Sequence, residues 1–437
     1  MDSLVLQRVR PSWAPPTLAV LAAITAGVVA QGGFYLPGRI LVTALALIAL
    51  ALAWQRFELR PLWLIAGAVA AWALLRAATA GGLADAAGIC LALLTLIAGV
   101  VVGRGARATD LAAGLTGLGA LVAITAWAGV AWRIERWSVL VESTLWRGAS
   151  TLTYANAAAA VLAACALLAL ALCTARPSKI QSLLLYLTIS GLGATLSRAG
   201  ALAFALGTAV FLLFGPRRKA LRHLIPAALG AAVATAALVP SFPATAAPQP
   251  LIALAGLAAG AVIALLHPWF ALGLALVGAL LVDRSTLDKV LDRRFTLDSQ
   301  GRSGALRSAL ETAREHPLLG SGPGQARYLW FDYKGDLVVS RWVHNEYLQW
   351  LVDLGAVGLL GLLVLIAALV VLMRRGDVGN PLWAGAVAAI AALAVHSAFD
   401  FLWELAVVPL LVGALTGLAA QPRSEEPAVS INGEEPQ

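Results

Sequence analysis

Apolar residues run along the chain in long blocks, and the short segments between the blocks hold most of the charged side chains. A helix needs about 17 to 25 mostly apolar residues to cross the hydrocarbon core of a bilayer. The pattern therefore predicts an all-α polytopic membrane protein with about 12–14 transmembrane helices. The fourteen expected segments are 16–36, 38–55, 61–80, 84–103, 109–132, 153–175, 180–197, 199–215, 220–240, 250–266, 268–283, 350–373, 380–399 and 401–420.

The basic residues give these helices a direction. With the N-terminus placed in the cytoplasm, five of the six inner loops carry Arg or Lys, and the short outer loops have almost none. This asymmetry is the positive-inside rule. The exception is the turn at His267-Pro268, which could instead be a kink. The basic residues of the inner loops are Arg56, Arg60, Arg104, Arg107, Arg176, Lys179, Arg217, Arg218, Lys219, Arg222, Arg374 and Arg375.

Composition agrees with a membrane protein and argues against a nucleic-acid partner. The chain is 60% hydrophobic and 12% charged, whereas a soluble domain carries about 25% charged residues. The net charge of +8 comes from orientation signals in short loops. The first block follows Arg8 and Arg10 without a convincing cleavage site, so we expect a retained helix and not a removed signal peptide. Cys90, Cys165 and Cys173 lie inside apolar blocks, which indicates small buried hydrophobes.

Two outer loops are longer than connectors need to be, at 133–152 and at 284–343. The second contains ten Lys or Arg and seven Asp or Glu. Its "SGALRSALETAREH" has helical periodicity, and "PLLGSGPG" is typical of a helix end followed by a turn. We therefore expect a small folded cap. The predicted divisions are N-terminal transmembrane helices (1–132), central helices with the first outer loop (133–283), a large extracytoplasmic loop (284–349), C-terminal helices (350–420) and a disordered cytoplasmic tail (421–437).

Arginines gather on the predicted outer side. Arg198 stands between two apolar blocks at the outer mouth. It could simply extend its side chain toward water, or it could bind an anion. Guanidinium groups grip phosphate through paired, charge-assisted hydrogen bonds. The large outer loop adds Arg302, Arg307 and Arg341 on the same side, which favours the anion site.

Other polar residues stand at the outer ends of apolar blocks. His344 is either a structural residue or a base that works near pH 7. Tyr154 and Asn156 lie at an outer helix start, where the asparagine could also cap the helix. His396 and Asp400 are four residues apart, so we expect them on one helix face. They would form a structural contact or support a site on the outer side.

Several short motifs appear in a fixed order. The pattern HN-x9-G-x-x-G fits residues 344–358, R-x3-L fits 302–306, "EHPLLGSGPGQ" covers 315–325, and "LSRAG" covers 196–200. With these motifs the chain from about Tyr154 to Leu411 resembles the O-antigen ligase/polymerase superfamily of bacterial envelopes.

The resemblance implies a GT-C-like glycosyltransferase that takes a glycan from undecaprenyl diphosphate and joins it to an acceptor hydroxyl. The reaction would take place at the outer (periplasmic) face of the bacterial cytoplasmic membrane. It implies that Arg198 and Arg302 hold the diphosphate and that His344 is essential for transfer. No metal and no cofactor are expected. The further residues expected to contact the substrates are Arg307, Arg341, Asn345, Asn156 and Tyr154, with His396 and Asp400 as possible supports.

Ligase, polymerase and protein glycosylation are the alternatives within the superfamily. The polymerase pattern R-x10-G has one weak instance, Arg293 to Gly304, and none beginning at Arg198. The single dominant outer loop and R-x3-L favour a ligase that uses a lipid A core as acceptor. A transporter or flippase would predict ionisable residues deep within spans and internal repeats, and we find no repeated halves. A purely structural protein would not need the charged outer loop.

Overall fold

The computed structural model of the chain describes residues 14–53, 59–141, 144–280, 300–331 and 335–423, with the side chains of 275–280 and 300–302 outside the description. Each of the fourteen predicted segments is a helix, and the chain does turn between two helices at His267-Pro268. The helices are α1 (Pro15–Val29), α2 (Leu36–Leu52), α3 (Arg60–Ala80), α4 (Leu83–Gly105), α5 (Ala108–Ala131), α6 (Ala155–Ala175), α7 (Lys179–Ala194), α8 (Arg198–Phe214), α9 (Arg217–Leu238), α10 (Pro250–Ala264), α11 (Pro268–Leu280), α14 (Glu346–Met373), α15 (Pro381–Ser397) and α16 (Val407–Ala419).

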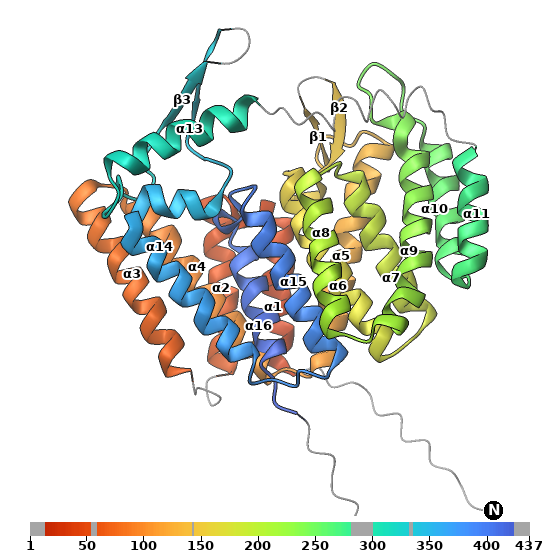
Figure 1. Cartoon of the computed structure of the whole chain (residues 1–437), viewed down its shortest axis with the longest axis horizontal. Coiled ribbons are helices and arrows are strands. Elements are labelled where there is room, and N and C mark those ends of the chain that lie inside the picture. The colour runs from red at the N-terminus through yellow and green to blue at the C-terminus, as the bar shows by residue number, and fades with distance from the viewer. Residues whose placement is uncertain (1–13, 54–58, 142–143, 281–299, 332–334, 424–437) are drawn as a thin grey trace, which may run out of the picture.

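Within the described residues, six helices are long and apolar enough to cross a membrane: α3, α4, α5, α6, α9 and α14. Six others are apolar but have 10–17 residues. The helices run up and down in one bundle, and the outer loops gather at one end of it (Figure 1). The predicted all-α polytopic membrane fold is confirmed. The tail predicted to be disordered falls mostly outside the described residues.

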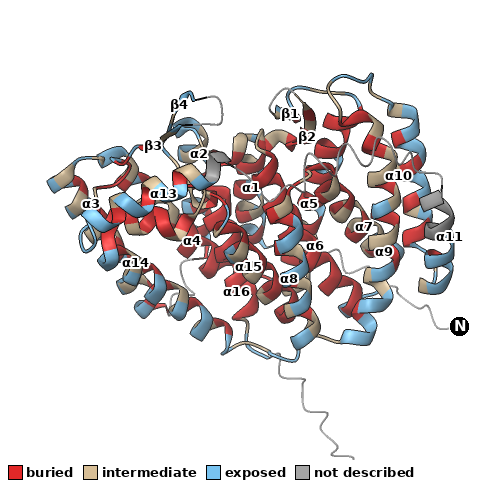
Figure 2. Ribbon diagram, turned by 45° about the horizontal axis from the view of Figure 1, so that its top comes forward, coloured by how far each residue is buried: buried red, intermediate tan, exposed pale blue. Residues whose placement is uncertain are grey.

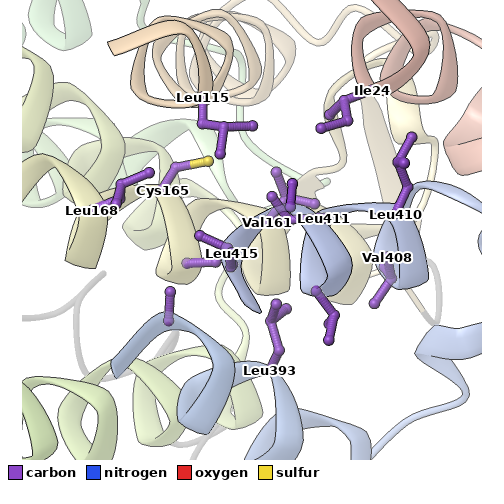
Figure 3. Packing of buried hydrophobic residues seen from close by; sticks show 14 of the residues in the cluster. Ile24, Leu115, Val161, Cys165, Leu168, Leu393, Val408, Leu410, Leu411 and Leu415 are labelled. Carbon is purple, nitrogen blue, oxygen red and sulfur yellow. The ribbon is translucent and has the colours of Figure 1, made fainter. Parts of the chain in front are cut away.

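The core lies along α6, which is buried over its whole length except for its last residue, Ala175 (Figure 2). Leu and Val side chains from α1, α5, α15 and α16 pack around it (Figure 3). Cys165 and Cys173 are buried and Cys90 is half-buried, and all three are free thiols, as predicted. Packing in lipid depends on close contact between helices because the hydrophobic effect does not favour one apolar neighbour over another.

Glycines set the closest helix contact, between α4 and α16. Gly99 and Gly103 on α4 face Gly413 and Gly417 on α16, so two G-xxx-G patterns meet. A Cβ on Gly413 would lie 2.0 Å from the Leu96 carbonyl oxygen. Small residues at this spacing let two backbones approach and gain dispersion contacts. This contact holds the C-terminal helix against the N-terminal part of the bundle.

The large outer loop is a folded cap, as predicted. It contains α13 (Gln300–Glu315) and a hairpin of β3 (Tyr328–Phe331) and β4 (Leu337–Ser340). Ala305, Ala309 and Ala313 form the buried face of α13 and share a small core with Tyr328 and Val343. The first outer loop holds a second antiparallel hairpin, β1 (Ser138–Val141) and β2 (Leu145–Gly148). Neither hairpin was predicted, because four-residue strands leave almost no periodic pattern in the sequence.

Candidate active site

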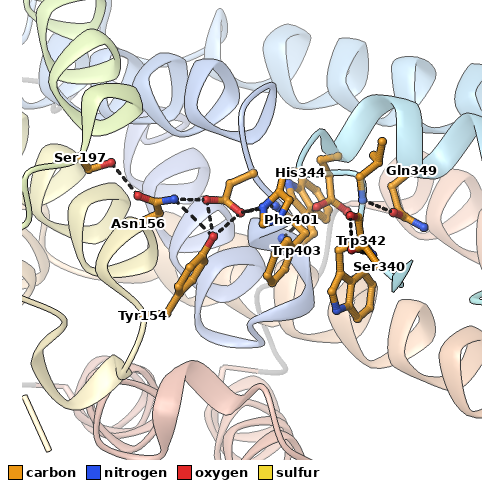
Figure 4. Close-up of polar contacts among 12 residues, drawn as sticks. Tyr154, Asn156, Ser197, Ser340, Trp342, His344, Gln349, Phe401 and Trp403 are labelled. Atoms are coloured by element: carbon orange, nitrogen blue, oxygen red, sulfur yellow. Dashed lines mark hydrogen bonds and ion pairs between the residues drawn. The ribbon is translucent and has the colours of Figure 1, made fainter. Parts of the chain in front are cut away.

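His344 lies between β4 and α14, and its side chain is drawn with Tyr154, Asn156 and Phe401 in Figure 4. Its backbone has a positive φ of 54°, which is uncommon for a residue with a Cβ. Its side chain is 30% exposed, and Nδ1 lies 3.1 Å from Oδ1 of Asp400. One ring nitrogen is therefore engaged with a carboxylate.

Asp400 is completely buried and is surrounded by hydrogen-bond donors. The Tyr154 hydroxyl lies 2.6 and 2.7 Å from its two oxygens, and Asn156 Nδ2 donates to Oδ2 at 2.6 Å. The backbone N–H of Phe401 donates to Oδ1 at 3.0 Å. A carboxylate accepts all of these bonds only in its ionised form. Asp400 therefore accepts from Nδ1–H of His344, and Nε2 of the imidazole is left as the basic nitrogen.

The network continues to the start of α8. Ser197 is the N-cap of α8, and its hydroxyl donates to Asn156 Oδ1 at 2.9 Å. The same oxygen accepts from Nη2 of Arg147 at 2.9 Å. Hydrogen bonds thus join β2, α6, α8, the turn after α15 and the start of α14. Arg198, the residue after Ser197, is placed at the edge of this network and is half-buried.

Strained backbone surrounds the network. Thr153 and Leu196 have φ values of 56° and 47°, and each directly precedes a network residue. Together with His344 they belong to the few non-glycine residues with positive φ in the described part of the chain. Such conformations cost about 1–3 kcal/mol each and cluster at functional sites. This clustering is an independent indication that the network is functional.

Aromatic rings cover one side of the His–Asp pair. Phe401 stacks on Tyr154 and on Trp342, with ring centroids 5.5 and 5.3 Å apart. The His344 ring lies 5.0 Å from the Phe401 ring. Phe34, from the turn between α1 and α2, touches the same group edge-on. These rings fix the imidazole plane and present flat apolar faces beside it.

The predicted arginines have different positions. Arg341 is partly exposed, forms an ion pair with Asp85, and lies over the Trp342 ring. Arg307 is exposed on α13. Arg302 lies in the first turn of α13, and its side chain is outside the described part of the chain. The structure thus brings His344 and the start of α8 together and leaves the contribution of the α13 arginines as a prediction.

Two predicted residues have structural partners that differ from the expectation. Asn345 caps α14, since its side chain accepts from Leu348 N at 3.0 Å. Asn156 does not cap α6 and instead donates to Asp400. The expected helix face shared by His396 and Asp400 is wrong, because α15 ends at Ser397 and Asp400 lies in the turn that follows. His396 is fully buried at the end of that helix.

Gly355 stands at a motif position where the structure requires glycine for a physical reason. Its φ of 69° breaks α14, and a Cβ there would lie 2.1 Å from the Leu318 carbonyl oxygen. The segment before the hairpin bonds to the opened turn, with Ser321 N donating to Val352 O and Ala356 N donating to Pro317 O. The break lets the cap lie against the helix that begins at Asn345.

Residues 183–363 match a family model described as O-antigen ligase. This segment, which is less than half of the chain, is similar to the O-antigen ligase family. Members of that family are membrane glycosyltransferases of the ligase and polymerase type, which agrees with the resemblance that the sequence motifs carry. The matched segment contains Arg198, α13 and His344. Asp400, Tyr154 and Asn156 lie outside it, so the partners of the histidine come from the flanking helices. No curated protein matches the chain.

Sequence reasoning missed several residues of the site. Arg147 was not singled out, because nothing in the sequence of its loop distinguishes it from the other arginines there. A second polar pair lies nearby, where the partly buried side chains of Arg39 and Glu404 are 3.2 Å apart. Burial raises the pKa of Glu404, and the Arg39 guanidinium opposes that shift. These two residues, with Glu346 and Asp353, line a cavity of about 30 Å³.

No group of three or more His, Cys, Asp or Glu residues in the described part of the chain is arranged to hold a metal ion. The chemistry available at the site consists of an imidazole oriented by a buried carboxylate, nearby arginines, and stacked aromatic faces. Such a constellation can accept a proton from a hydroxyl and neutralise an anion.

Proposed function

We propose that the protein is an O-antigen ligase that transfers a glycan as one unit from undecaprenyl diphosphate to a hydroxyl of a lipid A core. The transfer would take place at the outer face of the bacterial cytoplasmic membrane. The observation that carries this proposal is the contact of His344 Nδ1 with the buried Asp400, 3.1 Å apart, in a chain whose residues 183–363 match the O-antigen ligase family. The predicted orientation of the helices puts this contact at the outer rim of the membrane. The rim suits a donor whose polyprenyl tail stays in lipid while its sugars stay in water.

His344 would orient the acceptor hydroxyl and take its proton on Nε2. A bare Nε2 follows from Nδ1–H being held by Asp400, and the partly exposed side chain leaves room for a substrate. General bases of this kind contribute about 10²- to 10⁴-fold to a rate. The attack displaces the diphosphate in one step, so the configuration at the anomeric carbon inverts.

Arg198 and Arg302 would stabilise the leaving diphosphate. Negative charge builds on the departing oxygen, and guanidinium groups held in place stabilise it without reorganising. Arg198 is supported by its position next to Ser197, which is bonded into the network of His344. Arg302 is supported by the motif in α13. The diphosphate is already an activated leaving group, so the proposal includes no metal ion.

Substitution of each proposed residue tests the chemistry. We expect His344→Ala, Arg198→Ala and Arg302→Ala to lose transfer from a purified carrier-linked glycan to a core acceptor. Each variant should still elute as a monodisperse species in detergent. Lys179→Ala, at the inner start of α7, is the matched control and should retain full transfer. Full transfer by the His344 variant would remove the imidazole from the mechanism.

Removal of divalent cations tests the metal-free part of the proposal. We expect transfer to continue at the same rate in excess EDTA. An activity lost in EDTA and restored by added Mg²⁺ or Mn²⁺ would contradict it.

A polymerase is the second candidate, because the family covers both reactions and the motifs separate them weakly. Purified carrier-linked repeats should be supplied with and without the core acceptor, and the products separated on a gel. A ligase yields glycan on the acceptor only. Carrier-linked chains that lengthen without acceptor would identify a polymerase, and transfer to a protein acceptor would identify a protein glycosyltransferase. Movement of the intact glycolipid across the membrane without any transfer would identify a flippase.

A further inference from the structure

Arg147 is a buried arginine of the first outer hairpin, on β2. Its Nε donates to the Thr195 carbonyl oxygen at 2.7 Å, and its Nη2 donates to Asn156 Oδ1 at 2.9 Å. The strand that carries it is held firmly, since Trp146 N donates to the Phe242 carbonyl oxygen at 2.8 Å. Removing a charged guanidinium from water costs free energy, so the burial of Arg147 and the hydrogen bonds it makes there need a physical explanation.

The two ends of the Asn156 amide have different partners. Oδ1 accepts from Arg147 and from the Ser197 hydroxyl, whereas Nδ2 donates to Asp400. An asparagine amide can rotate by 180° with little change in shape, which exchanges its donor and its acceptor. A guanidinium has donors only, so Arg147 requires the oxygen on its own side. The nitrogen must then face the carboxylate.

We propose that Arg147 is a positioning residue that locks the Asn156 amide and thereby sets the tautomer of His344. With the amide locked, Asp400 meets a donor on its Oδ2 side and stays an ionised acceptor. The carboxylate then holds Nδ1–H of His344 at 3.1 Å and leaves Nε2 unprotonated. With the amide free to turn, its oxygen would face Asp400 at 2.6 Å and repel it. The effect of Arg147 on catalysis rests on the proposed function, whereas its effect on the tautomer of His344 does not.

Arg147→Gln separates this role from a structural one. The glutamine amide nitrogen ends near the position of arginine Nε, so it keeps the bond to Thr195 and loses the donor to Asn156. Arg147→Met loses both. If the arginine only holds the fold, glutamine should restore activity. The proposal expects both variants to lower kcat by about 10- to 100-fold with KM unchanged.

A double-mutant cycle tests whether Arg147 acts through Asn156. Asn156→Leu should lower kcat by itself, and adding Arg147→Gln to it should change kcat less than twofold further. Independent, multiplying effects would overturn the proposal. Arg133→Gln is the matched control, because Arg133 lies in the same outer loop and donates to the Pro243 and Ala246 carbonyl oxygens. Its kcat should equal that of the unsubstituted protein.

Nitrogen-15 NMR of histidine-labelled protein in nanodiscs reads the tautomer without any transfer assay. The His344 signals, assigned by their loss in His344→Asn, should show a protonated Nδ1 and a bare Nε2, with a mixture of tautomers in Arg147→Gln. An unchanged tautomer in that variant would overturn the inference. A changed tautomer in a protein that transfers no glycan would refute the proposed function and leave the inference standing.

Discussion

Replacing Asp400 with asparagine changes one atom at the centre of the site. The side chain keeps its shape, and the free carboxylate oxygen becomes an amide nitrogen. The four partners of Asp400 named above all donate to it: Tyr154 Oη, Asn156 Nδ2, Phe401 N and His344 Nδ1. The new NH₂ must therefore face a donor in either orientation of the amide.

The two orientations have unequal costs. With NH₂ at the Oδ2 position, it meets Asn156 Nδ2 at 2.6 Å, and two donors clash. With NH₂ at the Oδ1 position, it meets His344 Nδ1 at 3.1 Å, and the imidazole can move its proton to Nε2 and accept. We expect the second orientation, which still leaves Phe401 N without an acceptor. A buried unsatisfied group costs about 1–3 kcal/mol of folding free energy.

We expect the transfer rate of Asp400→Asn to fall by more than its loss of folding free energy alone would cause. An imidazole with a proton on Nε2 cannot take a proton from the acceptor hydroxyl, so the contribution of the base is lost. We expect kcat to fall about 10²- to 10⁴-fold with KM within twofold. The assay is single-turnover transfer from carrier-linked glycan to acceptor, measured in nanodiscs beside a thermal unfolding curve.

The matched control is Asp377→Asn, which changes an aspartate paired with Arg423 at the opposite end of the bundle. It should keep the unsubstituted rate. Unsubstituted kcat in Asp400→Asn, with the protein folded, would refute the assignment of the tautomer and of Asp400 as its cause.

Two further predictions concern stability. Gly355→Ala should lower the unfolding free energy by at least about 1–2 kcal/mol, because φ is +69° and the new Cβ would meet the Leu318 carbonyl oxygen; Gly273→Ala, with open space at its Cβ, should not lower it. The pKa of Glu404 is raised in the folded state, so folding favours the protonated carboxyl group. This contribution to the unfolding free energy is fully present below about pH 4.3 and is lost as pH rises through the folded pKa. The melting temperature of Glu404→Gln relative to the unsubstituted protein should therefore increase from pH 4.5 upward, and a constant difference would contradict this.

The helical spans and the two long loops between them could be predicted from the sequence, whereas the direction of the spans across the membrane stays a prediction. Block length and hydropathy are local properties, and a bilayer leaves the backbone no alternative to helices. The motifs singled out His344 and Arg198, and their location at the outer rim rests on the predicted orientation. The short strands could not be predicted, because β1 to β4 have four residues each and are held by contacts outside themselves.

The partners within the site were decided by tertiary structure alone. Sequence spacing placed Asp400 with His396, but the helix ends at Ser397, and the turn carries the carboxylate to a histidine 56 residues away. Arg147 likewise joins the network through Asn156 because the folded chain, and not the spacing in the sequence, brings the two side chains together. Contacts between distant residues depend on where helices end and how closely they pack, and neither is encoded in the local pattern of apolar and polar positions.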